Sequence, residues 1–219
     1  MPIEHLLYRC PGCGHDPIMA TPRGAWCESC YTSFEQGNSS VVIANFPDGK
    51  IEEYSVNTLM STIEKLGGIS RDIFNHNGEK PYEAHVKVSR GNNHKSVRWK
   101  GRVIGFFEHI TEHQVAILKL KKDYLTLAWG EQNSLVWPLE NLTAIQISSK
   151  AIQINIRGKG LYQIEFVSDS PRRWEDLLQC TLYRFYKNQG QRVIAFQPRI
   201  ITETSPPQDT DAYRTGQGT

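Results

Sequence analysis

The chain has 219 residues, of which 39% are hydrophobic and 22% charged, and its net charge at neutral pH is +2. No apolar run approaches the roughly 20 residues of a membrane-spanning helix, and residues 1–5 do not begin a basic region followed by an apolar stretch. We therefore expect two small globular domains in a cytoplasmic protein without a transmembrane segment or signal peptide, able to associate peripherally with a membrane.

Four cysteines near the N-terminus form two Cys-x-x-Cys pairs with thirteen residues between the pairs. They are Cys10, Cys13, Cys27 and Cys30. Each pair places two thiolates on one side of a tight turn, and two such turns facing each other make the tetrahedral sulfur site that suits Zn²⁺. Gly12 and Gly14 allow the positive φ angles that the first turn needs, whereas the second turn lacks glycine. We expect one structural Zn²⁺, because the closed site leaves no position for a catalytic water.

Two disulfides are the alternative interpretation of the same cysteines. Cytosolic thiols stay reduced, so a metal site is the better interpretation of a chain without an export signal. Residues 8–31 resemble a zinc ribbon, which implies the same four metal ligands. Cys180, the fifth cysteine, falls inside a predicted helix and is expected to be a buried, unreactive thiol.

The zinc ribbon is predicted to span residues 1–46 and to close with a strand at residues 40–44. Apolar residues at helical spacing then predict a helix over residues 55–66 that ends at a pair of glycines. The apolar residues of this predicted helix are Val56, Leu59, Met60, Ile63 and Leu66. This helix and a linker rich in Asn, Gly and Pro make up the predicted segment 47–81.

Short strands separated by tight turns follow from residue 82 and precede a single helix. The clearest hairpin alternates Ile152, Ile154 and Ile156 with polar residues and turns at residues 158–160. Strands without intervening helices pair antiparallel in a barrel or sandwich. The strand candidates are 83–89, 97–107, 113–120, 123–129, 134–138, 142–148, 151–157 and 160–167.

The last predicted element is an amphipathic helix, with Ser170 as its N-terminal cap and Pro171 at its first position. One apolar stripe runs along this helix. Its members are Trp174, Leu177, Leu178, Thr181, Leu182 and Phe185. We expect the stripe to cover the open end of a small bent barrel, with Arg173, Glu175 and Arg184 facing water.

In the order of their elements, residues 82–190 resemble a pleckstrin-homology-like (PH-like) domain. Such a domain is a seven-stranded bent barrel capped by a C-terminal helix with a Trp near its start, which Trp174 matches. The resemblance implies an α+β fold that is mainly β. The ribbon and this domain together are similar to the non-catalytic N-terminal region of bacterial lysophospholipid acyltransferase-family proteins. The polar residues 198–219 are expected to be a disordered tail.

No catalytic motif is found in the sequence. The acyltransferase family carries a His followed five positions later by Asp, and none of the seven histidines here has Asp at that position. Glycine-rich phosphate loops, Gly-x-Ser-x-Gly and His-Glu-x-x-His are absent from the sequence as well. His109 and His113 are four residues apart, but their neighbours suit strands meeting at a turn. We therefore expect a binding protein without catalytic activity.

Basic residues are concentrated at the start of the predicted barrel. Residues 84–104 contain six Lys or Arg, two His and no acidic residue, which favours an anionic partner. A solvated strand face is the alternative, because basic residues near position 100 alternate with other residues at period two. The residues predicted to contact an anion or partner are Lys87, Lys95, Arg98, Lys100 and Arg102.

Three classes of partner follow from these features. The PH-like resemblance implies an adaptor that binds a protein or an anionic phospholipid surface, with Lys100 and Arg102 in the Lys-x-Arg part of a phosphoinositide motif. Lys87 lies slightly too far away to complete that motif, and Lys95 too near. A nucleic acid is the second class, although the ribbon itself is not basic. The third is an accessory part of a lysophospholipid acyltransferase that lacks its catalytic domain.

Overall fold

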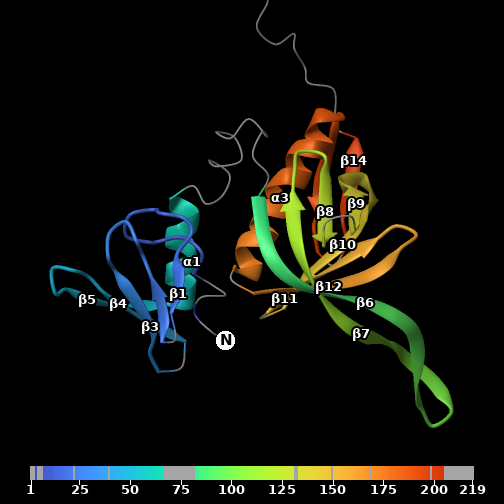
Figure 1. Cartoon of the computed structure of the whole chain (residues 1–219), viewed down its shortest axis with the longest axis horizontal. Helices are drawn as coiled ribbons and strands as arrows, with labels where there is room; N and C mark the ends of the chain where they lie inside the picture. The colour runs from blue at the N-terminus through green and yellow to red at the C-terminus, as the bar shows by residue number, and fades with distance from the viewer. Residues whose placement is uncertain are drawn as a thin grey trace, which may run out of the picture.

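The computed structural model describes residues 3, 7–21, 23–38, 40–66, 82–130, 133–148, 150–167, 169–197 and 199–204, and at residues 20, 92–99 and 103–112 it describes the backbone only. The described chain forms an N-terminal unit, residues 7–66, and a C-terminal unit, residues 82–204 (Figure 1). Both units are built mainly from β-strands, as predicted. Neither of the two helices is long and apolar enough to cross a bilayer within this part of the chain.

The N-terminal unit is an antiparallel meander of five strands followed by one helix. Its elements are β1 Met19–Thr21, β2 Gly24–Trp26, β3 Ser33–Gln36, β4 Val41–Asn45, β5 Ile51–Ser55 and α1 Val56–Lys65. The Ser55 hydroxyl caps α1 by accepting a hydrogen bond from the Thr58 N–H at 3.1 Å. Leu59 and Ile63 are the buried residues of this helix, so α1 lies where the sequence predicted it.

The predicted end of the ribbon at residue 46 is not a boundary in the sheet. Strand β5 pairs with β4 from Val41 opposite Ser55 to Asn45 opposite Ile51, across a turn in which Gly49 has a φ of 85°. The returning strand β5 was not predicted, because Glu52 and Glu53 interrupt a simple apolar alternation. Residues predicted as the start of a helix and linker therefore belong to the N-terminal sheet.

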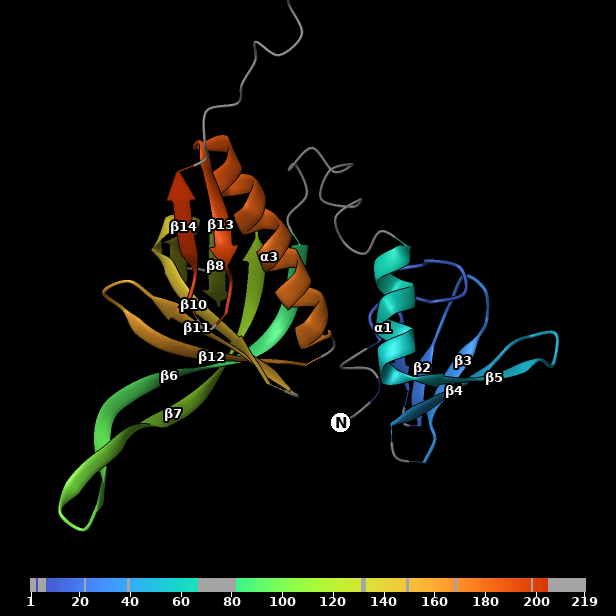
Figure 2. The ribbon, with the colours of Figure 1, turned by 180° about the vertical axis from the view of Figure 1, so that it is seen from behind.

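The C-terminal unit contains a seven-stranded antiparallel meander whose last strand returns to pair with its first. Its strands are β6 Tyr82–Trp99, β7 Arg102–Leu120, β8 Tyr124–Trp129, β9 Asn133–Pro138, β10 Leu142–Ile147, β11 Ala151–Ile156 and β12 Gly160–Phe166. A short 3₁₀ helix, η2 Leu139–Asn141, joins β9 to β10. The order across the sheet is β10-β11-β12-β6-β7-β8-β9, and the sheet curls around helix α3, Pro171–Asn188 (Figures 1 and 2).

The strand predicted at residues 97–107 is wrong. Those residues span the tip of the β6–β7 hairpin, where Lys100 and Gly101 form the turn with φ angles of 47° and 78°. Two consecutive positive φ angles give the turn that matches strand twist, but Lys in the first position hides it in the sequence. His109 and His113 accordingly lie within the long strand β7 and not at a turn between strands.

Strands β6 and β7 continue beyond the sheet as a two-stranded ribbon. Strand β12 pairs with β6 only as far as Arg90, and β8 pairs with β7 only from Ile117 onward. The β6–β7 ladder itself runs from Tyr82 opposite Leu120 to Trp99 opposite Arg102, with irregularities that bend it. We call residues 91–112 the arm, which projects away from the rest of the C-terminal unit (Figures 1 and 2).

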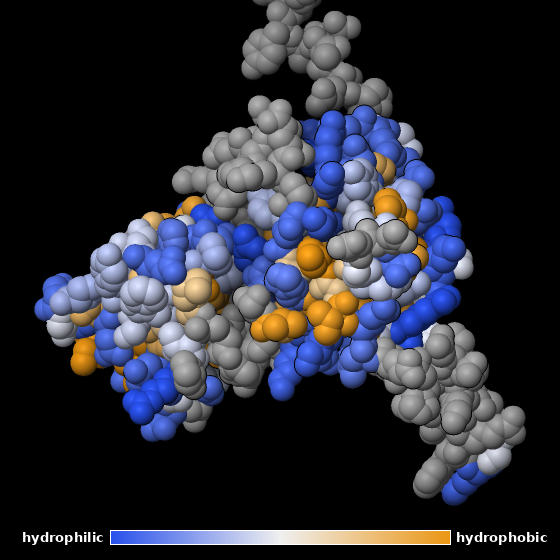
Figure 3. All heavy atoms as spheres, viewed as in Figure 1, coloured by the Kyte–Doolittle hydropathy of each residue, from blue (hydrophilic) through white to orange (hydrophobic). Residues whose placement is uncertain are grey.

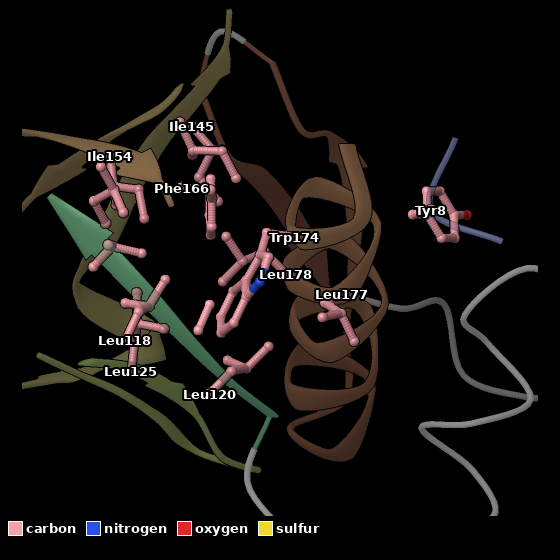
Figure 4. Packing of buried hydrophobic residues seen from close by; sticks show 14 of the residues in the cluster. Tyr8, Leu118, Leu120, Leu125, Ile145, Ile154, Phe166, Trp174, Leu177 and Leu178 are labelled. Carbon is pink, nitrogen blue, oxygen red and sulfur yellow. The ribbon is translucent and has the colours of Figure 1, made fainter. Parts of the chain in front are cut away.

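Helix α3 fills the inner side of the curled sheet, and its predicted limits are confirmed. The Ser170 hydroxyl accepts a hydrogen bond from the Arg173 N–H, and Pro171 is the first helical residue. Trp174 is fully buried, with its ring stacked on Phe166 at a centroid distance of 5.6 Å (Figure 4). The other buried members of the stripe are Leu177, Leu178, Thr181 and Leu182.

The opposite side of α3 does not face water as predicted. Glu175 is only 4% exposed, and the Arg173 side chain donates hydrogen bonds to Asp16 and Asp169. The prediction assumed one buried face. The N-terminal unit and the segment after α3, from which Gln197 donates a hydrogen bond to Glu175, cover further parts of the helix.

The predicted disordered tail, residues 198–219, is wrong at residues 201–204, which form a strand. Strand β14 Ile201–Thr204 pairs with β13 Gln191–Ala195, and the Ile200 N–H donates to the Thr143 carbonyl at 3.0 Å. The four residues of β14 have mixed polarity, so their sequence alone does not predict a strand. Their pairing with β13 identifies them as one. Residues 205–219 of the predicted tail lie outside the described residues.

Replacing Trp174 with alanine should destabilise the C-terminal unit by about 3–5 kcal/mol, because the substitution leaves a large cavity against Phe166. Tyr183→Ala is the matched control, since Tyr183 lies on the same helix and is 42% exposed. The control should change the free energy of unfolding by less than about 0.5 kcal/mol. Urea unfolding followed by circular dichroism measures both, and similar small effects of the two substitutions would contradict the packing described here.

Candidate functional site

The four N-terminal cysteines come together in space. Cys10 and Cys13 lie in the loop before β1, and Cys27 and Cys30 lie between β2 and β3. All four sulfur atoms lie within 4.8 Å of one another. The Cys10 and Cys30 sulfurs are 3.5 Å apart and those of Cys13 and Cys27 are 3.6 Å apart, far longer than a disulfide bond of about 2.05 Å. All four are free thiols, so the disulfide interpretation is wrong.

The sulfur distances fit a metal ion at the centre of the group. A tetrahedral site with metal–sulfur bonds of about 2.3 Å has its sulfurs about 3.8 Å apart, close to the two distances above. Four thiolates are a soft donor set, which Zn²⁺ and iron accept and which Mg²⁺ and Ca²⁺ do not. Cys10, Cys13, Cys27 and Cys30 can therefore hold one metal ion, as predicted.

The two cysteine turns share one backbone conformation. The Gly14 N–H donates to the Cys10 carbonyl at 2.8 Å, and the Tyr31 N–H donates to the Cys27 carbonyl at 2.9 Å. One residue further on, the carbonyls of His15 and Thr32 accept from the N–H groups of the two first cysteines. Because both turns have the same backbone hydrogen bonds, their two pairs of sulfur atoms face a common point.

Tyr31 occupies the position in the second turn that Gly14 occupies in the first. Their φ angles are 59° and 77°, both in the left-handed region. A residue with a side chain is rarely found there, which is why the sequence made the second turn look weaker than the first. The Tyr31 ring is 64% exposed and lies against Trp26 at a centroid distance of 6.0 Å.

The protonation of the cysteines depends on their surroundings. Burial raises the pKa of the Cys10 and Cys27 thiols, because it penalises the thiolate form. At Cys30 burial acts in the same direction, but hydrogen bonds from the Thr32 hydroxyl and N–H and from Cys10 and Cys13 outweigh it and lower the pKa to about 6. A bound cation would favour the thiolate at all four positions.

The first cysteine turn also contacts helix α3 of the C-terminal unit. Asp16 accepts hydrogen bonds from Arg9 at 3.4 Å and from Arg173 at 3.0 Å. The Tyr8 hydroxyl donates to Asp176 at 2.7 Å, and burial together with this carboxylate raises the Tyr8 pKa above its usual range. Figure 4 shows Tyr8 on the side of α3 that faces away from the sheet.

The predicted basic residues do not form one cluster. Lys100 and Arg102 are exposed at the tip of the arm, where they flank Gly101. Lys87 is exposed within the sheet, between Val115 and Glu165 on the neighbouring strands. Lys100 lies thirteen positions after Lys87, roughly 40 Å along an extended strand.

The remaining two predicted basic residues, Lys95 and Arg98, lie in the arm. Lys95 is opposite Phe107 and Arg98 is opposite Val103 in the β6–β7 ladder. The side chains of Lys95 and Arg98 lie outside the described part of the structure. The backbone therefore places these two residues with Lys100 and Arg102 on one projecting hairpin.

A cavity of about 760 Å³ lies on the inner side of the sheet, where the arm begins. The sequence patterns did not single out its basic residues, Arg90 and Lys159, as partners of one site. Arg90 ends the paired part of β6 and Lys159 lies in the turn before β12, 69 positions later. Only the pairing of β12 with β6 brings them together, so no local signal in the sequence could have found them.

Comparison with known proteins gives no family for this chain. No protein-family model matches it, and no curated protein sequence matches it.

We expect one tightly bound metal ion per chain. A site of four thiolates stabilises its fold by on the order of 10 kcal/mol in model peptides, so Cys13→Ser should abolish stoichiometric binding and unfold residues 7–66. Cys180→Ser is the matched control, because Cys180 lies in α3 away from the metal group. Elemental analysis gives the stoichiometry, and hydrogen exchange locates the unfolding.

Purified protein without stoichiometric metal would contradict this prediction. So would equal metal content in the Cys13→Ser and Cys180→Ser variants. In the Cys13→Ser variant, the backbone amides of strands β6–β12 should stay protected from hydrogen exchange, because that sheet has its own buried core.

The shared backbone of the two turns predicts opposite responses to substitution. Gly14→Ala should cost about 1–2 kcal/mol, since a Cβ is disfavoured at its positive φ although nothing lies within 4 Å of it. Tyr31→Gly removes the same strain and should leave stability within about 1 kcal/mol of wild type. Chelator-induced unfolding of both variants measures this, and an equal loss in both would show that Tyr31 is not strained.

Proposed function

We propose that this chain is a non-catalytic zinc-binding adaptor whose PH-like domain binds an anionic phospholipid surface. The metal is assigned as Zn²⁺ because the donor set is four thiolates with near-tetrahedral spacing. A site that uses all four positions for protein ligands has no room for substrate. The ion therefore stabilises the N-terminal unit, which is too small to bury a large core.

The order of elements in the C-terminal unit supports a PH-like domain. Seven antiparallel strands form a meander in which β12 pairs back to β6, and a single helix follows the last strand. Trp174, the fourth residue of that helix, fills the inner side of the sheet.

The proposed anionic partner is inferred from the basic residues of the arm. Residues 91–107 contain four Lys or Arg and no acidic residue, while Glu108 and Glu112 follow near the base of the arm, so its net charge is +2. The hairpin extends the basic residues away from the rest of the C-terminal unit. Lys100 and Arg102 are exposed at its tip. Each Lys or Arg near an anionic membrane contributes about 1 kcal/mol, so the arm has enough charge for measurable binding.

The apolar residues of the arm favour a membrane over a nucleic acid. Trp99, Ile104 and Phe106 lie in a two-stranded ribbon that no third strand joins in the described ladder. Trp is favoured at the headgroup level of a bilayer. The rings of Trp99 and Phe106 suit stacking on bases as well, so the preference for a membrane rests on the aliphatic Ile104, which offers a base no ring. Hydrophobic residues also gather on one face of the C-terminal unit (Figure 3). Val115, in β7 just after the arm, is 66% exposed.

A protein partner and a nucleic acid are the other candidates. An acidic protein surface would satisfy the same charges, and the two-stranded arm offers unpaired strand edges to it. The N-terminal unit supports a nucleic acid only through its zinc-ribbon-like turns. An accessory role for an acyltransferase rests on the resemblance of the ribbon and PH-like domain alone.

Binding to phosphatidylserine vesicles tests the proposal. Reversing the charges of Arg98, Lys100 and Arg102 to Glu should weaken co-sedimentation at least tenfold, and added salt should weaken wild-type binding steeply. The matched control reverses three exposed lysines elsewhere on the C-terminal unit, which should weaken binding much less. They are Lys122, Lys150 and Lys187.

Equal losses in the two triple variants would show that net charge and not the arm governs binding. Unchanged binding in the arm variant would overturn the proposal. Tight binding to single-stranded DNA that the arm variant loses, without vesicle binding, would favour the nucleic-acid alternative.

A further inference from the structure

The cavity at the base of the arm occupies the end of the sheet that α3 does not fill. Along β12, Phe166 stacks on Trp174, while Tyr162, four residues earlier on the same inner face, lines the cavity. Arg90 on β6 is opposite Tyr162 and is the last residue of β6 before the arm. The helix therefore fills one end of the curled sheet, and the cavity opens at the other.

The walls of the cavity are mostly apolar. Ala116, Leu127 and Tyr162 form its most buried part and are at most 5% exposed. Trp129 and Leu135 line it nearer the surface, where both are half-buried. A cavity of about 760 Å³ lies within the range of small-molecule sites, which combine apolar walls with a few polar groups.

Its mouth is cationic. The Arg90 guanidinium donates to the Lys159 carbonyl at 3.0 Å and lies 5.8 Å from the centre of the Tyr162 ring. These two contacts hold it over the apolar part of the cavity. The Lys159 side chain is exposed beside it, and His113, fixed by a hydrogen bond to Ser89 at 2.9 Å, lines the same mouth. Among the described lining residues there is no carboxylate.

We propose that this cavity binds a single-chain anionic amphiphile, with the anionic head at Arg90 and Lys159 and the alkyl chain against Leu127, Leu135 and Tyr162. A guanidinium fork matches the geometry of phosphate or carboxylate oxygens. A small hydrophilic anion would leave the apolar walls in contact with water, whereas an alkyl chain covers them at about 25 cal/mol per Å². The site goes beyond the proposed function, because it requires neither the tip of the arm nor a membrane.

Dodecyl phosphate, used below its micellar concentration, is the probe. Isothermal titration calorimetry on the full metal-loaded chain should show saturable one-to-one binding. Replacing Arg90 and Lys159 together with Gln should weaken it at least tenfold. The control, Lys122→Gln with Lys150→Gln, removes two exposed lysines that do not line the cavity and should leave binding unchanged.

Two further variants test the apolar part of the site. Ala116→Phe places a ring inside the cavity, and Leu135→Trp narrows it from a half-buried position that tolerates a larger side chain. Either should abolish binding, and Leu135→Trp should leave circular dichroism and thermal unfolding near wild type. Because Leu135 is not in the fully buried core, its variant keeps the test informative even where Ala116→Phe fails to fold.

Ligands related to dodecyl phosphate test the contributions of the anionic head and of the alkyl chain separately. Dodecanoate and dodecyl phosphate should both bind, and their ratio distinguishes a fatty acid from a monoalkyl phosphate as the natural class. Inorganic phosphate and dodecanol should bind at least tenfold more weakly than dodecyl phosphate. Absence of saturable binding, binding of inorganic phosphate equal to that of dodecyl phosphate, or full binding by folded Leu135→Trp would each overturn the site.

The arm variant with Arg98, Lys100 and Arg102 changed to Glu separates this site from the vesicle-binding proposal. It should retain dodecyl phosphate binding within about threefold while losing vesicle binding. Loss of both activities in this variant, with the fold intact, would show that the cavity and the arm form one surface and would overturn the independent site.

Discussion

The rest of the structure depends on the burial of helix α3 on two sides. Trp174 and Leu178 point into the curled sheet, and Leu177 points the other way, toward Tyr8 (Figure 4). All three α3 side chains are fully buried. A helix with apolar residues on more than one face needs more than one layer to cover it, and here the second layer comes from the N-terminal unit. The helix thereby joins the two units as well as filling the sheet.

The contacts on that second side are polar and partly buried, which makes their geometry important. Asp16 lies between Arg9 and Arg173, and its side chain is only 8% exposed. Removing one partner from such a group leaves a buried charge and costs several kcal/mol. Asp16 belongs to the loop that Cys10 and Cys13 fix in place, so the metal centre also holds the contact with α3. The N-terminal unit thereby supports the C-terminal unit by covering the second side of α3.

The binding features lie at the end of the sheet that α3 leaves open. The β6–β7 arm carries exposed basic residues at its tip, and the cavity with Arg90 and Lys159 lies at its base. Neither feature shares residues with the metal centre. This separation allows the proposed anion binding to be tested without changing the four-cysteine group. It also means that stability and binding can be altered by different substitutions.

Elements whose signals are local could be predicted from the sequence. The spacing of four cysteines predicted the metal group, the alternating isoleucines predicted the β11–β12 hairpin, and Ser170 with Pro171 predicted the start of α3. Each of these depends on residues a few positions apart, so the pattern and the structure report the same interaction. A run of short strands followed by one helix also predicted the mainly β, α+β fold class, although one of the eight strand candidates was wrong.

The tertiary structure was needed to show which surfaces of the helices are covered and which strands extend beyond the sheet. The burial of Glu175 and the pairing of Arg173 with Asp16 need the N-terminal unit and the segment after α3, which lie far away in the sequence. Likewise, the length of the arm follows from where β8 and β12 stop pairing, and the cavity from residues on five strands. The periodicity of apolar residues predicts which face of an element is buried. It does not predict which distant segment of the chain covers that face, because that contact joins residues far apart in the sequence.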